Sequence, residues 1–353
     1  MEFIQELKQT FASGKTKSFD WRKEQLLNLK RLMVENEQAI YKALEQDLGK
    51  CEFEVYIAEY SFVLHDIDNF LKKLKKWMKP VNISTPVLAQ PGSSKLVPEP
   101  YGVSLIMGAW NYPIQLVLSP MVASLAAGNC VVLKPSELAE NTSKLIADLI
   151  PKYLDRSAIH VFEGGVEETT ELLGQRFDHI MYTGSEMVGK IVMRAASEHL
   201  TPVCLELGGK RPGIVDDSTN LKVTADRIIW GKFLNAGQTC IAPDYILVTP
   251  QQREPLIKAL KNSLVKQFGR EPSQSKDYGR IVNHRHFKRL MAYLEDNQDN
   301  IIIGGQSNEE QKFITPTLVF NPDLDCKLMQ EEIFGPILPI VEIDSVSHAI
   351  DFI

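Results

Sequence analysis

The chain has 353 residues, more than the roughly 250–300 at which a single hydrophobic core stops growing, so we expect at least two domains. Hydrophobic residues make up 44% and charged residues 24%, as in ordinary globular proteins, and a net charge of −6 argues against a general nucleic-acid binder. Five cysteines without a CxxC motif argue against a disulfide framework, so we expect a reducing, cytoplasmic location.

Neither a leader peptide nor a membrane span is expected. The first residues, MEFIQELKQTF, are charged throughout, and no stretch approaches 18 consecutive apolar residues. A metal site is not expected either, because HExxH is absent and His284 and His286 point apart on a helix. We therefore interpret NHRHF (283–287) as solvated surface.

The N-terminal part predicts two helices and a hairpin. Hydrophobic periodicity indicates helices over 20–46, with Asp20 as N-cap, and over 54–78, which Pro80 ends. Residues 80–100 contain several prolines, and two alternating stretches flank a PGSS turn. We interpret this segment as a projecting β-hairpin, an arm of the kind that often serves oligomer contacts.

From residue 102 onward, short runs rich in Val, Ile and Leu alternate with helical patterns. This alternation predicts an α/β fold whose parallel sheet is covered on both faces, and such sheets bind ligands at the carboxyl ends of their strands. The predicted strands are 102–110, 129–135, 158–164, 179–184 and 202–209, and the helices are 112–128, 141–154, 166–174 and 185–200. A second series follows, with helices 221–235 and 252–268 and strands 245–250, 301–303, 317–320 and 336–343.

Cys240 ends the small-residue loop NAGQTC (235–240), which lies between two apolar runs. A thiol that another molecule must reach needs such open surroundings, whereas a buried inert thiol does not. Backbone N–H groups of the loop could stabilise its thiolate. The alternative is an ordinary buried cysteine.

Two polar residues interrupt apolar strand ends. Glu206 lies in VCLELGG, where a buried carboxylate with a raised pKa would suit a general base that activates water. The alternative is an ion pair with Lys210 or Arg211. Asn111, in AWNYP, could donate its amide to an oxyanion or could simply form the turn before a helix with Pro113 in its first turn.

Three further segments have features of a nucleotide site. YTGSEMVGK (182–190) follows a strand and opens a helix, where free N–H groups and the helix dipole favour phosphate, although the GxGxxG spacing is absent. Lys134 and Glu137 follow another strand and could bind ribose hydroxyls, or form a charge pair. In QEEIFGP, Glu332 and Phe334 could hold a ribose and back a nicotinamide ring, or belong to an ordinary loop.

Taken together and in this order, the motifs AWNYP, LKPSE, YTGS, LELGGK, NAGQTC and EEIFGP resemble those of the NAD(P)-dependent aldehyde dehydrogenases, closest to the class 3-like bacterial branch. The resemblance covers essentially the whole chain. It implies a Rossmann-like, parallel-sheet NAD(P)-binding domain over 1–206, interrupted by the arm at about 80–100, and a second α/β catalytic domain over 207–353.

The resemblance also implies the roles of the site residues. Cys240 is the implied nucleophile, Glu206 the general base and Asn111 an oxyanion donor, together with the backbone N–H of Cys240. Lys134 and Glu137 match the adenine-ribose contacts, and Glu332 and Phe334 the nicotinamide-ribose side, with Glu332 as a second candidate base. The pyrophosphate region comprises Gly184, Ser185, Glu186, Met187, Val188 and Gly189. No metal is implied.

Family members normally continue well beyond EEIFGP, so the resemblance implies a chain truncated at its C-terminus that lacks the strand which pairs with the arm in the expected homodimer. The expected reaction is oxidation of an aldehyde to an acid. The alternatives are an impaired fragment that retains at most NAD binding, and a cysteine hydrolase, which would need a histidine beside Cys240. Glu137 would repel a 2′-phosphate, so we expect NAD, with NADP possible.

Overall fold

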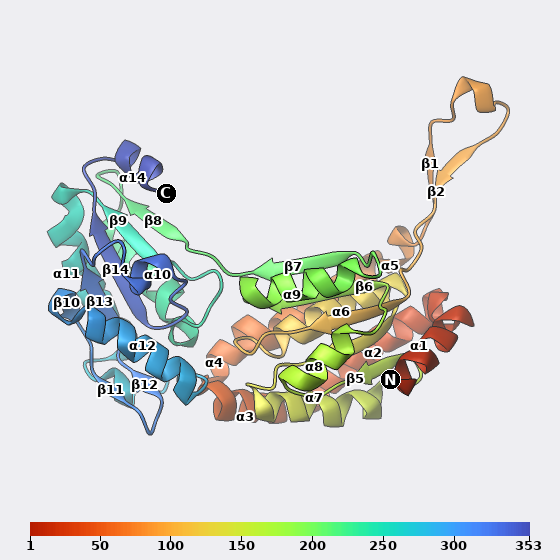
Figure 1. The fold of residues 1–353 in the computed structure, drawn as a ribbon, viewed down its shortest axis with the longest axis horizontal. Helices are drawn as coiled ribbons and strands as arrows, with labels where there is room; N and C mark the ends of the chain where they lie inside the picture. The colour runs from red at the N-terminus through yellow and green to blue at the C-terminus, as the bar shows by residue number, and fades with distance from the viewer. The chain divides into compact units, whose positions relative to one another are not determined.

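The computed structural model describes residues 1–353, which divide into two compact units. The first unit comprises Met1–Ala43 and Val55–Leu207, and the second comprises Leu44–Glu54 and Gly208–Ile353. Each unit is built around its own five-stranded sheet (Figure 1). No helix is long and apolar enough to cross a lipid bilayer.

The first unit contains a parallel sheet with strand order β5-β4-β3-β6-β7. The central strands β3 (Val103–Met107) and β4 (Cys130–Lys134) are buried along their whole length, which explains their continuous apolar sequences. The other strands are β5 (Ile159–Val161), β6 (His179–Gly184) and β7 (Val203–Leu207). β7 lies at one edge of the sheet, and its residues alternate between half-buried and exposed.

Helices pack against this sheet: α6 against β3 and β4, α7 against β5, and α9 against β6 and β7. The helices of this part of the chain are α1 (Glu2–Ala12), α2 (Phe19–Glu35), α3 (Glu37–Leu48), α5 (Ser61–Trp77), α6 (Gln115–Ala127), α7 (Glu140–Tyr153), α8 (Val166–Leu173) and α9 (Glu186–Ser197). A π-helical turn, Tyr56–Tyr60, connects α4 (Glu52–Val55) to α5.

The helix predicted over 20–46 is in fact two helices, because the chain leaves the helical conformation at Asn36. Its N-cap is also two residues earlier than predicted. The Ser18 hydroxyl accepts a hydrogen bond from the amide of Trp21 at 3.1 Å, and Asp20 lies in the first turn instead.

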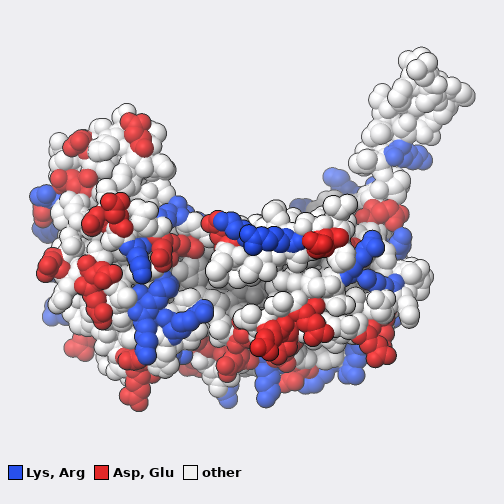
Figure 2. Space-filling model, in the orientation of Figure 1, with Lys and Arg blue, Asp and Glu red and all other residues white.

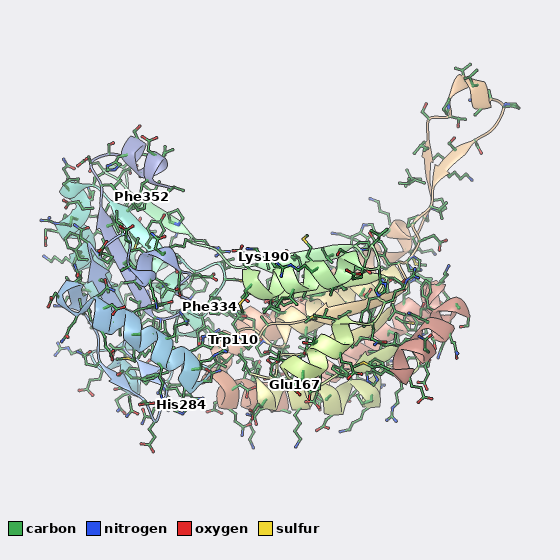
Figure 3. All side chains as sticks on the ribbon, in the orientation of Figure 1. Trp110, Glu167, Lys190, His284, Phe334 and Phe352 are labelled. Atoms are coloured by element: carbon green, nitrogen blue, oxygen red, sulfur yellow. The ribbon has the colours of Figure 1, made fainter.

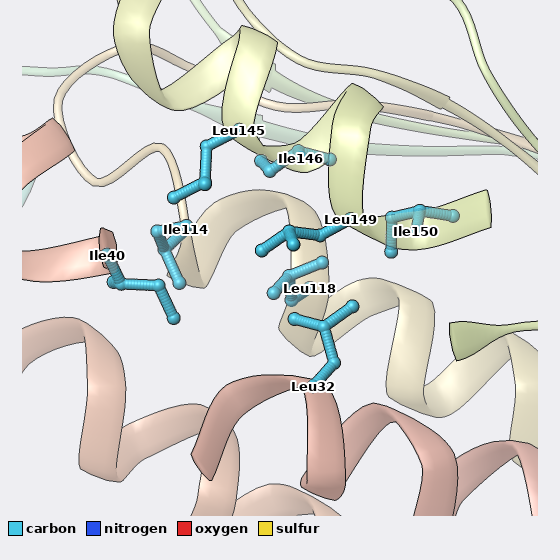
Figure 4. A pocket seen from close by; sticks show the side chains of 8 residues that line it. All are labelled: Leu32, Ile40, Ile114, Leu118, Leu145, Ile146, Leu149 and Ile150. Atoms are coloured by element: carbon cyan, nitrogen blue, oxygen red, sulfur yellow. The ribbon is translucent and has the colours of Figure 1, made fainter. Parts of the chain in front are cut away.

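A small cavity lies within the helical layer of the first unit and is lined only by aliphatic side chains (Figure 4). Its volume of about 10 Å³ leaves room for one water at most, and no polar group is present to bind that water. The cavity is therefore a packing defect and not a substrate pocket. Its lining residues are Leu32, Ile40, Ile114, Leu118, Leu145, Ile146, Leu149 and Ile150.

The proline-rich segment forms an antiparallel pair, β1 (Val81–Ile83) with β2 (Ser94–Leu96), in the register Val81 to Leu96. Apolar side chains on this hairpin face solvent: Val87 is 87% exposed and Leu88 fully exposed. Its outer part carries no charged side chain (Figure 2). The hairpin is thus an exposed apolar surface.

The second unit has strand order β10-β13-β14-β9-β8, in which only β10 is antiparallel to its neighbour. The strands are β8 (Pro212–Val215), β9 (Tyr245–Val248), β10 (Ile301–Ile303), β13 (Thr317–Phe320) and β14 (Ile337–Glu342), with a separate short pair β11 (Ser307–Asn308) and β12 (Phe313–Ile314). The helices are α10 (Leu221–Phe233), α11 (Pro250–Phe268), α12 (His284–Asp296), α13 (Lys327–Gln330) and α14 (Val346–Phe352).

The interpretation of NHRHF as solvated surface is wrong in part. Asn283 caps α12, accepting a hydrogen bond from the amide of His286 at 2.9 Å. Phe287 is buried, and burial together with Arg289 and Arg285 lowers the pKa of His286 to about 4. His286 is therefore a partly buried, neutral residue at physiological pH.

Candidate active site

The candidate residues of the first unit lie at the carboxyl ends of the strands of its sheet. Because β3, β4, β6 and β7 are parallel and in register, with Met107 beside Lys134 and Gly184 beside Leu207, their carboxyl ends lie together. Asn111 follows β3, Lys134 ends β4, Gly184 ends β6 and Glu206 lies near the end of β7. Asn111 is 2% exposed, so its loop is part of the packed structure.

Lys134 and Glu137 form a direct ion pair at this edge. The Lys134 ammonium donates to a Glu137 carboxylate oxygen at 2.6 Å. The lysine side chain is only 6% exposed and the glutamate is 44% exposed, so the buried cation holds the carboxylate at the surface. A carboxylate presented in this way can accept hydrogen bonds from the two hydroxyls of a ribose.

The start of α9 presents backbone N–H groups next to the end of β6. The Ser185 hydroxyl caps the helix and accepts from the amide of Val188 at 3.4 Å. Glu186 pairs with Lys190 at 2.5 Å, and this hydrogen bond lowers the pKa of Glu186 (Lys190 is labelled in Figure 3). Met187 is 71% exposed. This helix start suits an anionic group such as a diphosphate, with Lys190 offsetting the charge of Glu186.

Glu206 is exposed, so the expectation of a buried carboxylate is wrong. It sits on the edge strand β7 opposite Thr183, with its side chain on the exposed face. The two partners considered for a structural ion pair have other acids: Lys210 pairs with Asp244, and Arg211 with Glu332.

In the second unit, the NAGQTC loop has an unusual backbone. Asn235 (φ 52°), Ala236 (φ 50°) and Gly237 (φ 76°) are consecutive left-handed residues, a conformation that is unfavourable for side chains other than glycine. All three are buried, whereas Cys240, three residues on, is partly exposed. The surrounding structure therefore holds a strained loop that ends at a partly exposed cysteine.

The Gln238 side chain supports this loop. Its buried side-chain amide donates to the carbonyls of Asn235 at 3.0 Å and Arg280 at 2.9 Å, and its oxygen accepts from the amide of Val282 at 3.0 Å. The Asn235 side chain in turn donates to the carbonyl of Gln238 at 3.1 Å. A fully hydrogen-bonded buried amide of this kind specifies one loop conformation.

The NAGQTC loop packs directly on the EEIFGP segment. A Cβ placed on Gly237 would lie 2.5 Å from the carbonyl carbon of Gly335 and 3.0 Å from the nitrogen of Pro336. Only glycine permits this approach of two backbones. The contact brings the segment with Cys240 next to the segment with Glu332 and Phe334, which are 92 residues or more apart from it in the sequence.

Glu332 lies against the glycines of LELGGK. A side chain at Gly208 would overlap its carboxylate, and the amide of Gly209 donates a hydrogen bond to it. The Arg211 guanidinium lies 3.4 Å from a carboxylate oxygen of Glu332. Burial raises the pKa of Glu332, although the Gly209 hydrogen bond and Arg211 oppose this. A partly desolvated carboxylate beside a cation can bind hydroxyls or take up a proton.

Sequence reasoning missed the buried charges that hold EEIFGP in place. Asp244, 4% exposed, accepts from the amide of Ile333 at 3.1 Å and pairs with Lys210, which donates to the carbonyl of Glu331 at 2.8 Å. Lys232, 1% exposed, lies 4.0 Å from Asp244, and burial lowers its pKa to about 8. A charged residue in the apolar run IIWGKFL was the available signal.

Residues 2–353 match the sequence model of the aldehyde dehydrogenase family. The chain belongs to this family. It is 47% identical to aldehyde dehydrogenase family 3 member A2 of Pongo abelii over 99% of this chain and 72% of that protein. It is 46% identical to the dimeric NADP-preferring aldehyde dehydrogenase of Canis lupus familiaris, over 100% of this chain and 77% of that protein.

Solved aldehyde dehydrogenases have the same fold. The substrate-bound structure of Staphylococcus aureus AldH is similar with a TM-score of 0.98 and 46% sequence identity, covering 100% of this chain and 77% of that one. The class 3-like resemblance predicted from the six motifs is thereby confirmed, as is the α/β fold with parallel sheets. The relatives differ in cofactor: one is named NADP-preferring, and a Mycobacterium tuberculosis aldehyde dehydrogenase, 25% identical, is complexed with NAD⁺.

Proposed function

We propose that this chain oxidises an aldehyde to a carboxylic acid through a thioester on Cys240. The main observation in support is the NAGQTC loop. A strained backbone, fixed by Gln238 and by the glycine contact with EEIFGP, ends in a partly exposed thiol. An inert structural cysteine would not need a loop held in this way.

In the proposed reaction the Cys240 thiol gives its proton to solvent water, and its sulfur adds to the aldehyde carbon. The negative charge that develops on the aldehyde oxygen is stabilised by two donors, the Asn111 amide and the backbone N–H of Cys240. A bound nicotinamide cofactor would supply the hydride acceptor for the former aldehyde carbon, and a thioester would then remain on Cys240. Glu206 then deprotonates a water that attacks the thioester, releasing the acid and restoring the thiol.

The exposure of Glu206 suits this last role, because a base that activates water must be reached by water. Glu332 is the second candidate base, since burial raises its pKa. We assign Glu332 and Phe334 first to the nicotinamide-ribose side, because the Gly208–Gly209 backbone and Arg211 hold the carboxylate in one place.

The proposed cofactor contacts lie in the first unit. Lys134 and Glu137 would hold the adenine ribose, and residues 184–189 at the start of α9 would hold the diphosphate. NAD is the preferred cofactor in this proposal, because the Glu137 carboxylate would repel the 2′-phosphate of NADP. Because Lys134 weakens that repulsion, the proposal also allows NADP, although less well than NAD. The exposed apolar hairpin is proposed as a dimer contact.

The test is NADH formation with a panel of short, long-chain and aromatic aldehydes, each with NAD and NADP. Cys240→Ser should abolish NADH formation, because a hydroxyl is almost wholly protonated at neutral pH. Cys51→Ser is the matched control, a partly exposed cysteine of the same unit that should retain activity. Wild-type turnover in Cys240→Ser would refute the assignment, and NAD binding without any turnover would support the impaired fragment instead.

A further inference from the structure

The first turn of α6 is stabilised from outside the helix. The first i to i−4 hydrogen bond runs from the amide of Leu116 to the carbonyl of Tyr112 at 2.9 Å. The amides of residues 113, 114 and 115 therefore have no partner inside the helix. Pro113 has no N–H, so two donors remain, those of Ile114 and Gln115.

Glu59 accepts both donors. One of its carboxylate oxygens lies 2.9 Å from the amide of Ile114 and 3.4 Å from that of Gln115. Glu59 is fully buried and belongs to the π-helical turn Tyr56–Tyr60, a feature that often occurs at functional sites. A buried carboxylate needs such donors, and the positive end of the helix dipole favours its charge.

This arrangement fixes Asn111, which lies one residue before Tyr112. On its other side the loop is fixed by the sheet, since the amide of Gly108 continues the β3–β4 ladder and donates to the carbonyl of Lys134 at 3.1 Å. The short segment 109–113 is therefore anchored at one end by β3 and β4 and at the other by Glu59. Glu59 anchors the segment through its side chain, which accepts hydrogen bonds from the amides of Ile114 and Gln115.

We propose that Glu59 is a positioning residue for the oxyanion donor: by holding the first turn of α6, it holds the Asn111 amide in its productive orientation. Glu59 does not touch the substrate in this proposal. The inference rests on the proposed role of Asn111, and it adds a residue that none of the motifs contains.

The test is a double-mutant cycle that combines Glu59→Ala and Glu59→Gln with Asn111→Ala. Loss of an oxyanion donor lowers kcat by about 10²–10³-fold, and we expect this for Asn111→Ala. Displacement of a donor by roughly 1 Å costs about 10²-fold, so Glu59→Ala should lower kcat by about 10–100-fold. Glu59→Gln, which keeps an acceptor oxygen, should lose less. In the Asn111→Ala background either Glu59 change should have less than about a 3-fold effect, because the positioned group is gone.

Glu168→Ala is the matched control. Its carboxylate also accepts a helix-start amide, that of Gly165 at 2.9 Å in α8, but it has no connection to Asn111. This variant should lose some thermal stability and keep its kcat. Amide hydrogen exchange adds a readout that needs no activity. In both Glu59 variants the amides of residues 111–116 should exchange faster than in the wild type, and the exchange rates over α8 should stay the same. If Glu59→Ala fails to fold, Glu59→Gln carries both measurements.

Equal losses from Glu59 substitution in the wild-type and Asn111→Ala backgrounds would overturn the inference, because Glu59 would then act only through stability. Unchanged exchange over 111–116 in a folded Glu59→Gln or Glu59→Ala variant would overturn it as well. A normal kcat in Asn111→Ala would instead refute the proposed role of Asn111. Faster exchange over 111–116 in the same preparation would still show that Glu59 holds the turn.

Discussion

The contact between Gly237 and Gly335 makes a quantitative prediction for Gly237→Ala. The new Cβ would lie 2.5 Å from the carbonyl carbon of Gly335, whereas ordinary van der Waals contact begins at 3.4 Å, so the two backbones must separate by on the order of 1 Å. Overpacking of this kind typically costs about 1–3 kcal/mol. The left-handed backbone (φ 76°) adds about 1–2 kcal/mol for a residue with a Cβ.

We therefore expect Gly237→Ala to lower the free energy of unfolding by about 2–5 kcal/mol. For a unit of this size the Tm would fall by roughly 4–20 °C. Because the displaced loop carries Cys240, kcat for aldehyde oxidation should also fall, by about 10²-fold for a 1 Å shift. Differential scanning calorimetry and NADH formation measure the two effects.

Gly14→Ala is the matched control. Gly14 has φ 78°, almost the same as Gly237, but a Cβ there would meet no atom within 4 Å. This variant should show only the backbone penalty of about 1–2 kcal/mol and normal activity. If Gly237→Ala destabilises no more than Gly14→Ala and keeps its kcat, the two loops do not pack as described and the reasoning is wrong.

Three further predictions concern the base, a buried lysine and the hairpin. Glu206→Gln should release about one equivalent of NADH per chain in a burst and then turn over about 10²–10⁴-fold more slowly than the wild type. Stopped-flow absorbance measures both phases. Unchanged steady-state turnover would favour Glu332 as the base. Lys232 has its pKa lowered by burial from 10.5 to about 8, so between these pH values the unfolded chain holds more protons than the folded chain, and stability should rise with pH. Denaturant unfolding should therefore show the wild type gaining roughly 2 kcal/mol relative to Lys232→Met between pH 8 and pH 10, and parallel pH profiles would contradict the low pKa. If the hairpin is the proposed dimer contact, Leu88→Lys should shift the light-scattering mass from dimer to monomer without lowering the Tm. Val166→Lys, at a position 78% exposed outside the hairpin, should leave the mass unchanged. A dimer in both variants would locate the interface elsewhere.

The fold class and the chemistry-bearing segments could be predicted from the sequence because their signals are local. Continuous apolar runs such as VVL in β4 occur where a parallel strand is covered on both faces. The motifs AWNYP, LKPSE and YTGS lie at the carboxyl ends of the strands β3, β4 and β6. Capping was less predictable: Ser18 and Asp20 are both good N-cap residues, and only the backbone conformation shows which one is used. The π-helical turn that carries Glu59 has no sequence signature.

The six motifs and their order were enough to predict the family from the sequence alone. Each motif is a short run of residues, so it can be read without knowing the fold. Only the tertiary structure decided how the side chains are supported. Glu206 was expected to be buried, because its neighbours are apolar, but it lies on the exposed face of an edge strand. Gln238, Asp244 and Lys232 gain their importance from partners 12–89 residues away, and a sequence pattern carries no information about such partners. An open position for Cys240 was expected from its loop of small residues, and the cysteine is partly exposed. The contact of Gly237 with Gly335 that holds this loop depends on two backbones meeting in space.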